Sequence, residues 1–128
     1  MKKFFLIMFF MAFVSVNAYS QSDDSNNEVY AMVEEAAQFP GGQSEMLKFI
    51  QENRQYPEEA KSQNLHGRVI VSFIVEKDGS ISEVMVKRSL GSGCDEEAVR
   101  VINSMPKWKP GKQRGKEVRT SHMVPITF

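Results

Sequence analysis

The stretch 67–89, GRVIVSFIVEKDGSISEVMVKRS, constrains the fold more than any other part of the chain. Its apolar side chains recur at every second position on either side of a turn at Lys77-Asp78-Gly79, and side chains in a strand alternate between two faces. This pattern predicts a β-hairpin with one buried face, formed by Val69, Val71, Phe73, Val75, Val84 and Val86. Ile81 and Val84 have opposite parity, which predicts a bulge just after the turn. A lone hairpin is marginally stable in water, so the rest of the chain must cover the buried face.

The first 18 residues predict an export signal. Lys2 and Lys3 precede the apolar run 4–16, and the small residues that follow suit cleavage after Ala18. The run is shorter than the roughly 20 apolar residues that span a bilayer. We therefore expect a signal peptide over 1–18 and a periplasmic location, with an uncleaved segment that anchors the chain in the inner membrane as the alternative.

Charge is unevenly distributed along the chain. Acids prevail from 23 to 59, whereas between Arg100 and Arg119 seven bases accompany one acid, Glu117. This basic region is either a solvated face or a docking patch for an acidic partner. It carries no aromatic-studded basic motif, which argues against nucleic acid as a partner. Cys94 is the only cysteine, so no intramolecular disulfide can form.

The region 19–38 is polar and predicts a flexible arm, with a transient helix or a docked strand as alternatives. Residues 39–128 predict a single domain. Around the hairpin, apolar spacing and charged ends predict helices over 43–53, 57–63 and 95–105.

A last strand is predicted over 118–128, and Pro125 within it indicates a sheet edge because proline cannot donate to a ladder. Trp108 is expected to close one end of the core. Cys94 is expected to be a small buried residue.

Catalytic and metal-binding signatures are missing from the sequence. The two histidines and the one cysteine are scattered singly, with no spacing that predicts a metal site. No nucleophile elbow, phosphate loop or dinucleotide fingerprint is present. We therefore expect no enzyme and no cofactor. What remains is a small α+β domain whose unpaired edge strand can accept an extended peptide through main-chain hydrogen bonds.

Eight short motifs occur in order along the chain: Tyr56-Pro-Glu-Glu-Ala60, Gly67-Arg-Val69, Phe73-x-Val75-x-x-Asp78-Gly79, Val86-x-x-Ser89, Asp95-x-x-Ala98, Trp108-x-Pro110-Gly111, Gly115-Lys116-x-Val118 and Pro125-x-x-Phe128. Together they resemble the TonB C-terminal domain, over about residues 39–128. The resemblance implies a three-stranded antiparallel sheet with two to three helices packed on one face. It also implies a periplasmic domain that binds the TonB box of outer-membrane transporters by adding this peptide to the edge of the last strand.

On that basis the peptide-binding residues would be Val118, Arg119, Thr120, Ser121, His122, Met123 and Val124, with Gln55, Tyr56 and Pro57 close to the docked peptide. No catalytic or metal-binding residue is implied.

Two functions remain open. Family members that transduce energy engage an ExbB/ExbD-type inner-membrane complex through an uncleaved helix and a long tether. Here only about twenty residues separate the apolar run from the domain, a reach of at most roughly 70 Å. The chain therefore either supports TonB-dependent transport as a transducer or accessory, or is a soluble peptide- or protein-binding module that transmits no force. Self-association into a homodimer through the edge strand is compatible with both.

Overall fold

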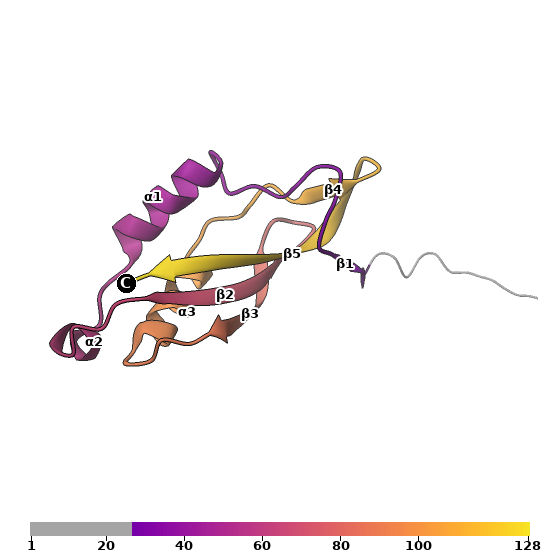
Figure 1. Ribbon diagram of the computed structural model, residues 1–128. Coiled ribbons are helices and arrows are strands. Elements are labelled where there is room, and N and C mark those ends of the chain that lie inside the picture. Colours follow the sequence, from indigo (N-terminus) through magenta and orange to yellow (C-terminus); the bar gives the residue numbers. More distant parts are fainter. Residues whose placement is uncertain (1–26) are drawn as a thin grey trace, which may run out of the picture.

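A computed structural model describes residues 27–128 (Figure 1). Its elements are β1 (Val29–Tyr30), α1 (Gln43–Asn53), α2 (Glu58–Ser62), β2 (Arg68–Val75), β3 (Ile81–Arg88), α3 (Cys94–Asn103), β4 (Gly111–Gln113) and β5 (Lys116–Thr127). The expected signal peptide and the first residues of the expected arm lie outside this range. Within the described range, no helix is long and apolar enough to cross a membrane.

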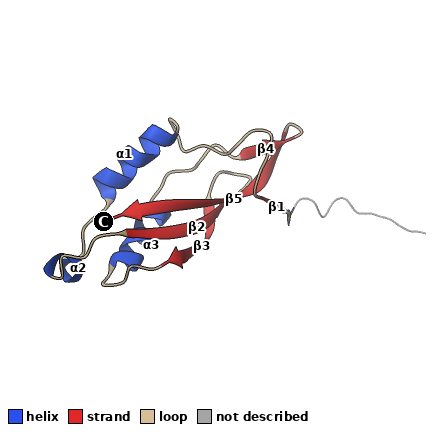
Figure 2. Cartoon of the chain, viewed as in Figure 1, coloured by secondary structure: helices blue, strands red, loops and turns tan. Residues whose placement is uncertain are grey.

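The sheet has the strand order β1-β5-β2-β3. The central strand β2 runs antiparallel to both β3 and β5, β1 runs parallel to β5, and β4 pairs with the beginning of β5. In Figure 2, α1 lies alongside β5, and α3 lies behind β2 and β3. The α+β class and the three-stranded antiparallel centre are confirmed, whereas the short strands β1 and β4 extend this centre beyond the prediction.

All three helices contribute to one hydrophobic core on a single face of the sheet. The core residues include Val69, Val71, Phe73 and Val75 from β2, Val124 and Ile126 from β5, Met46 and Ile50 from α1, Ala60 from α2, and Ala98, Val101 and Ile102 from α3. The predicted valine face is therefore the buried face. Burial of this apolar surface is the main driving force for folding, since the chain has no disulfide to add to it.

The hairpin of β2 and β3 contains the predicted bulge. The pairing register shifts between Ser72 and Ile74, and Glu83 opposite this shift has a positive φ of 50°. The extra residue brings Ile81 and Val84 to the same face, and both pack against the core. The bulge thus resolves the parity mismatch seen in the sequence.

The turn of the hairpin is packed against Trp108. Gly79 has a φ of 89°, and its carbonyl oxygen accepts a hydrogen bond of 2.8 Å from the backbone N–H of Trp108. The indole ring makes edge-to-face contacts with Phe73 and Phe39 at centroid distances of 5.5 and 6.0 Å. Trp108 is only 7% exposed, so its predicted role at the end of the core is confirmed.

The beginning of α3 is held by Asp95. Its carboxylate accepts hydrogen bonds from the backbone N–H groups of Leu90 and Gly91, at 2.8 and 3.1 Å, and from the Ser89 hydroxyl. Burial acts to raise the pKa of Asp95, but these hydrogen bonds outweigh it and the pKa is lowered. The preceding Cys94 is fully buried, and its burial raises the pKa of the thiol, as expected for a packing residue.

Candidate strand-binding edge

The long strand β5 presents one of its two backbone edges to β2. Their register is constant from the pair Arg68 and Thr127 to the pair Val75 and Thr120. Just beyond this ladder, Gly67 and Phe128 exchange two backbone hydrogen bonds, of 3.2 and 2.8 Å. Since such pairs alternate along an antiparallel ladder, the even-numbered residues of β5 direct their N–H and C=O groups to β2. The odd-numbered residues direct theirs to the outer edge.

Both ends of this outer edge are occupied. At one end β1 pairs with Arg119 and Thr120, and at the other the guanidinium of Arg54 donates a hydrogen bond to the carbonyl oxygen of Thr127. Between them, Met123 and Pro125 face no partner strand among residues 27–128. Pro125 has no N–H to offer, which agrees with its predicted place on an edge. The open stretch of the edge is therefore centred on Met123 and is shorter than the sequence indicated.

The side chains of the predicted site residues on β5 divide between the two faces of the sheet. Val118, Thr120 and Val124 are buried on the core side, His122 is half-buried there, and Ser121 and Met123 are exposed on the side without helices. Met123 is 64% exposed. Most of the predicted residues thus have side chains that support the strand, and a partner can reach the outward backbone groups and the exposed side chains of Ser121 and Met123.

Arg119 is occupied by contacts within the protein. Its guanidinium forms ion pairs with Glu76 at 2.8 Å and Glu83 at 3.0 Å, and donates a hydrogen bond of 3.0 Å to the carbonyl oxygen of Asn27. Hydrogen bonds from Arg119, and secondly from Ser82, lower the pKa of Glu76. Arg119 therefore ties β5 to the hairpin and to the N-terminal arm.

The structure places Gln55, Tyr56 and Pro57 near the C-terminal end of β5. The Gln55 N–H donates a hydrogen bond of 2.6 Å to the carboxylate of Glu97, and the Tyr56 ring lies 6.4 Å from that of Phe128, just after the end of β5. All three residues line a hollow of about 410 Å³ that includes no residue of 118–124. The two halves of the predicted site therefore do not line a common hollow.

A groove lies beside the open stretch of β5. It has a volume of about 330 Å³ and is lined by His122, Met123 and Val124 of β5, Ala36, Ala37 and Gln38 of the arm, Phe39 and Gly42 before α1, Gln43 and Met46 of α1, and Trp108. Successive side chains of a strand alternate between faces, so every second side chain of a strand added at Met123 would point to this helix-covered side. The groove thus provides a largely apolar pocket for a guest side chain.

His122 forms one wall of this groove. Its ring stacks on Phe73 and tilts against Trp108, with centroid distances of 5.8 and 5.3 Å. One ring nitrogen, Nε2, lies 2.9 Å from the hydroxyl of Thr120. Burial lowers the pKa of His122 below its usual value of 6.5, so the imidazole in the groove is neutral at neutral pH.

We expect His122 to make the protein less stable in mild acid. Above pH 6.5 the imidazole is neutral in both states, and the contribution of His122 to the free energy of unfolding is complete. As the pH falls through 6.5, the imidazole gains a proton more readily in the unfolded chain than in the native state, so the free energy of unfolding decreases. Urea midpoints measured between about pH 5.5 and 7.5 should show this slope, and His122→Gln should flatten it. The carboxylates of Glu76 and Asp95 lose their contributions in a separate window, below pH 4.5. An unchanged slope in His122→Gln would contradict this assignment.

Sequence reasoning missed two contributors to the edge, Arg54 and the docked residues 27–38 of the arm. A docked strand is one of the three alternatives that the sequence leaves open for the arm, but the sequence indicates neither its position nor its partner. Nothing local marked Arg54, because its partner Thr127 is 73 positions away. In the described part of the chain, no group of three or more His, Cys, Asp or Glu side chains is arranged to hold a metal ion.

Comparisons with known proteins place this fold. A family model described as the Gram-negative bacterial TonB protein C-terminal matches residues 52–128. Two solution structures of the Helicobacter pylori TonB C-terminal domain superimpose with TM-scores of 0.51 at 23% identity. They cover 66% and 70% of this chain and 89% and 84% of theirs. A Pseudomonas aeruginosa TonB C-terminal domain has a TM-score of 0.43 at 27% identity, with 59% of this chain and 78% of the other covered. A search of curated protein sequences found no match.

The match to the family model covers more than half of the chain, and the Helicobacter structures share its α+β arrangement. TonB C-terminal domains are non-enzymatic, are periplasmic in Gram-negative bacteria, and interact with outer-membrane TonB-dependent receptors. The sequence, the fold and the family match agree, and the chain belongs to the Gram-negative bacterial TonB protein C-terminal family.

Proposed function

We propose that this protein binds the TonB box of an outer-membrane transporter in the periplasm, by adding the peptide as a strand at the open stretch of β5. One observation carries the proposal: within residues 27–128 the outward N–H and C=O of Met123 face no partner strand, and the strand that carries them borders a largely apolar groove. Unpaired backbone groups on an edge strand are a template for strand addition. The family's role in TonB-dependent transport supports this assignment.

The geometry limits how a peptide binds. Main-chain hydrogen bonds at Met123 and at the carbonyl of Pro125 would fix its register, and the groove beside His122 would select one apolar side chain. Arg54 ends the open stretch at Thr127. We therefore expect weak binding by a short segment, as suits a contact that must be made and released repeatedly.

We expect Met123→Pro to weaken peptide binding at least tenfold, because proline lacks the N–H that faces the outer edge. The fold should survive, because this N–H forms no hydrogen bond with β2. Met123→Ala keeps this N–H and is the matched control. Isothermal titration with a synthetic TonB-box peptide measures the effect. Equal affinity of the two variants would reject this edge. Thr120→Pro is unsuitable, because the Thr120 N–H faces Val75 in β2 and its loss would weaken the sheet itself.

A crosslink in intact cells would identify the partner. A photoreactive amino acid at Ser121, which is exposed at the border of the open stretch, should capture a TonB-dependent transporter. The same residue at Glu52, an exposed position of α1 that lines none of the hollows described above, is the control. Capture of the same transporter from both positions would argue against binding at β5.

Peptide binding needs only the domain, whereas force transmission also needs an anchor and an ExbB/ExbD-type partner. The mass of the mature protein separates these cases. A chain that begins at Tyr19 would favour the soluble module, and a retained segment 1–18 would favour a transducer. A homodimer through β5 would appear as a mass in solution that rises with concentration.

A further inference from the structure

The N-terminal arm already lies on the outer edge of β5. Val29 pairs with Arg119 and Tyr30 with Thr120, in parallel orientation. The odd-numbered residues of β5 direct their backbone N–H and C=O groups to the outer edge. This register therefore places Tyr30 between the backbone groups of Arg119 and Ser121. The arm therefore pairs with outward backbone groups of β5, and Met123, two residues after Ser121, presents the same groups without a partner strand within residues 27–128.

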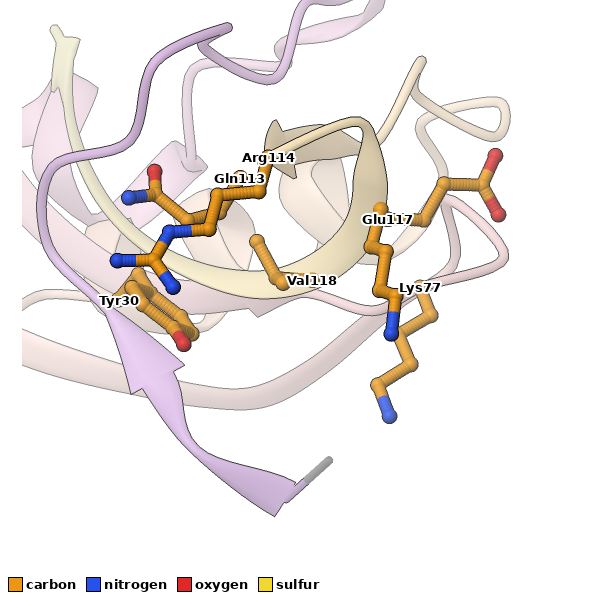
Figure 3. A pocket seen from close by; sticks show the side chains of 7 residues that line it. Tyr30, Lys77, Gln113, Arg114, Glu117 and Val118 are labelled. Atoms are coloured by element: carbon orange, nitrogen blue, oxygen red, sulfur yellow. The ribbon is translucent and has the colours of Figure 1, made fainter. Parts of the chain in front are cut away.

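The arm is acidic where the surface beneath it is basic. Tyr30 borders a hollow of about 420 Å³ whose lining includes Lys77, Arg114 and Lys116, and none of these three side chains forms an ion pair within residues 27–128. In Figure 3 the guanidinium of Arg114 extends towards Tyr30, and the carboxylate of Glu117 points away.

Two acidic residues of the arm contact the hairpin that β4 and β5 form. The carboxylate of Glu34 accepts a hydrogen bond of 2.9 Å from the backbone N–H of Arg114, and the backbone of Glu35 forms two hydrogen bonds with that of Lys112, at 3.1 and 2.8 Å. The arm also carries Glu28, whose carboxylate lies 3.3 Å from the Tyr30 hydroxyl. A hydrogen bond from a backbone N–H to the Glu34 carboxylate thus adds to the backbone pairing.

The two-residue strand β1 is the weakest part of this docking. Val29 is 40% exposed, and the arm is fixed again further along, where Gln38 forms two backbone hydrogen bonds with Lys109 and Phe39 is buried in the core. A ladder this short gains little from packing, and local opening costs least in such segments. Residues 28–30 can therefore leave the edge while the arm remains attached at 38–39.

We propose that residues 28–30 are an intramolecular occupant of the β5 edge, which closes Arg119 to Ser121 until an extended, acidic segment of a partner replaces it. This inference extends the proposed function, on which its biological role rests. A site that is open only part of the time binds more weakly in proportion to its open fraction. The arm would thus lower the affinity of the edge for a peptide. The side chains of Arg114 and Lys116 would favour peptides that carry acidic residues opposite them.

A pair of proline variants of the full chain tests the proposal. Tyr30→Pro removes the N–H that faces Arg119, whereas Val29→Pro removes one that faces solvent and is the matched control. The probe is a labelled peptide that copies residues 27–35. We expect it to bind Tyr30→Pro about 3- to 10-fold more tightly than the wild type or Val29→Pro. Equal affinity for all three proteins would overturn the proposal.

Two further measurements sharpen the result. The Arg119 and Ser121 amides should exchange hydrogen faster in Tyr30→Pro than in the wild type; fast exchange in both proteins would overturn the closed edge. A copy of the peptide with glutamine in place of its three glutamates should bind Tyr30→Pro more weakly at low salt, and equal binding would overturn the acidic preference.

A TonB-box peptide separates this inference from the proposed function. If it binds no variant while the arm copy binds Tyr30→Pro, the proposed function fails and the arm remains the occupant of the edge. If it binds the wild type and Tyr30→Pro equally, the proposed function stands and the arm is no competitor.

Discussion

Gly79→Ala is expected to destabilise the protein strongly. Gly79 has a φ of 89°, where a side chain costs about 1–2 kcal/mol, and an added Cβ would overlap the carbonyl oxygen of Trp108. Backbone cannot swing aside as a flexible side chain can, so relief requires the hairpin turn to separate from Trp108. We expect a loss of about 3 kcal/mol or more, against a total of about 5–15 kcal/mol for a typical domain. Urea denaturation followed by tryptophan fluorescence measures it.

Gly115→Ala is the matched control for this prediction. Gly115 also lies in a turn with positive φ, 77°, but a Cβ there meets nothing within 4 Å. This variant should therefore lose only the conformational part, about 1–2 kcal/mol. Equal losses in both variants would show that the contact between the turn and Trp108 adds nothing.

Val124→Lys should strongly destabilise the protein. Val124 is 5% exposed in the core, and an unpaired ammonium there is either desolvated or forces the core open. We expect a loss of about 3 kcal/mol or more, or failure to fold, seen as a lost melting transition. The adjacent Met123→Lys places the same charge on the exposed face and should melt within a few degrees of the wild type. Similar melting of both variants would contradict the assignment of faces.

The hairpin and its buried face were predictable because alternation is a local signal and the same residues form the core. The parity of Ile81 and Val84 even predicted the bulge at Glu83, since two core positions at odd spacing can share a face only through an extra residue. The end of the core at Trp108 followed from its size and apolar character. The hairpin and its bulge depend on residues close together in the sequence, and the burial of Trp108 follows from its own side chain.

The state of the edge was not predictable in the same way. Whether β5 is open depends on contacts of Arg54 with Thr127 and of Asn27 with Arg119, which join residues 73 and 92 positions apart. The two-residue strand β1 has no periodicity to detect, and its pairing follows from the placement of the arm. Sequence therefore indicated which strand lies at the border of the sheet, but not how much of that border is covered.

The shortness of the unpaired border also affects how molecules of this protein meet one another. A long bare β-strand invites copies to stack edge to edge into fibrillar aggregates. Here Pro125 interrupts the donors, Arg54 blocks one end and β1 blocks the other. A second molecule could form only a few main-chain bonds along β5 before meeting one of these obstacles, so this edge resists stacking between copies while it can still accept a short peptide.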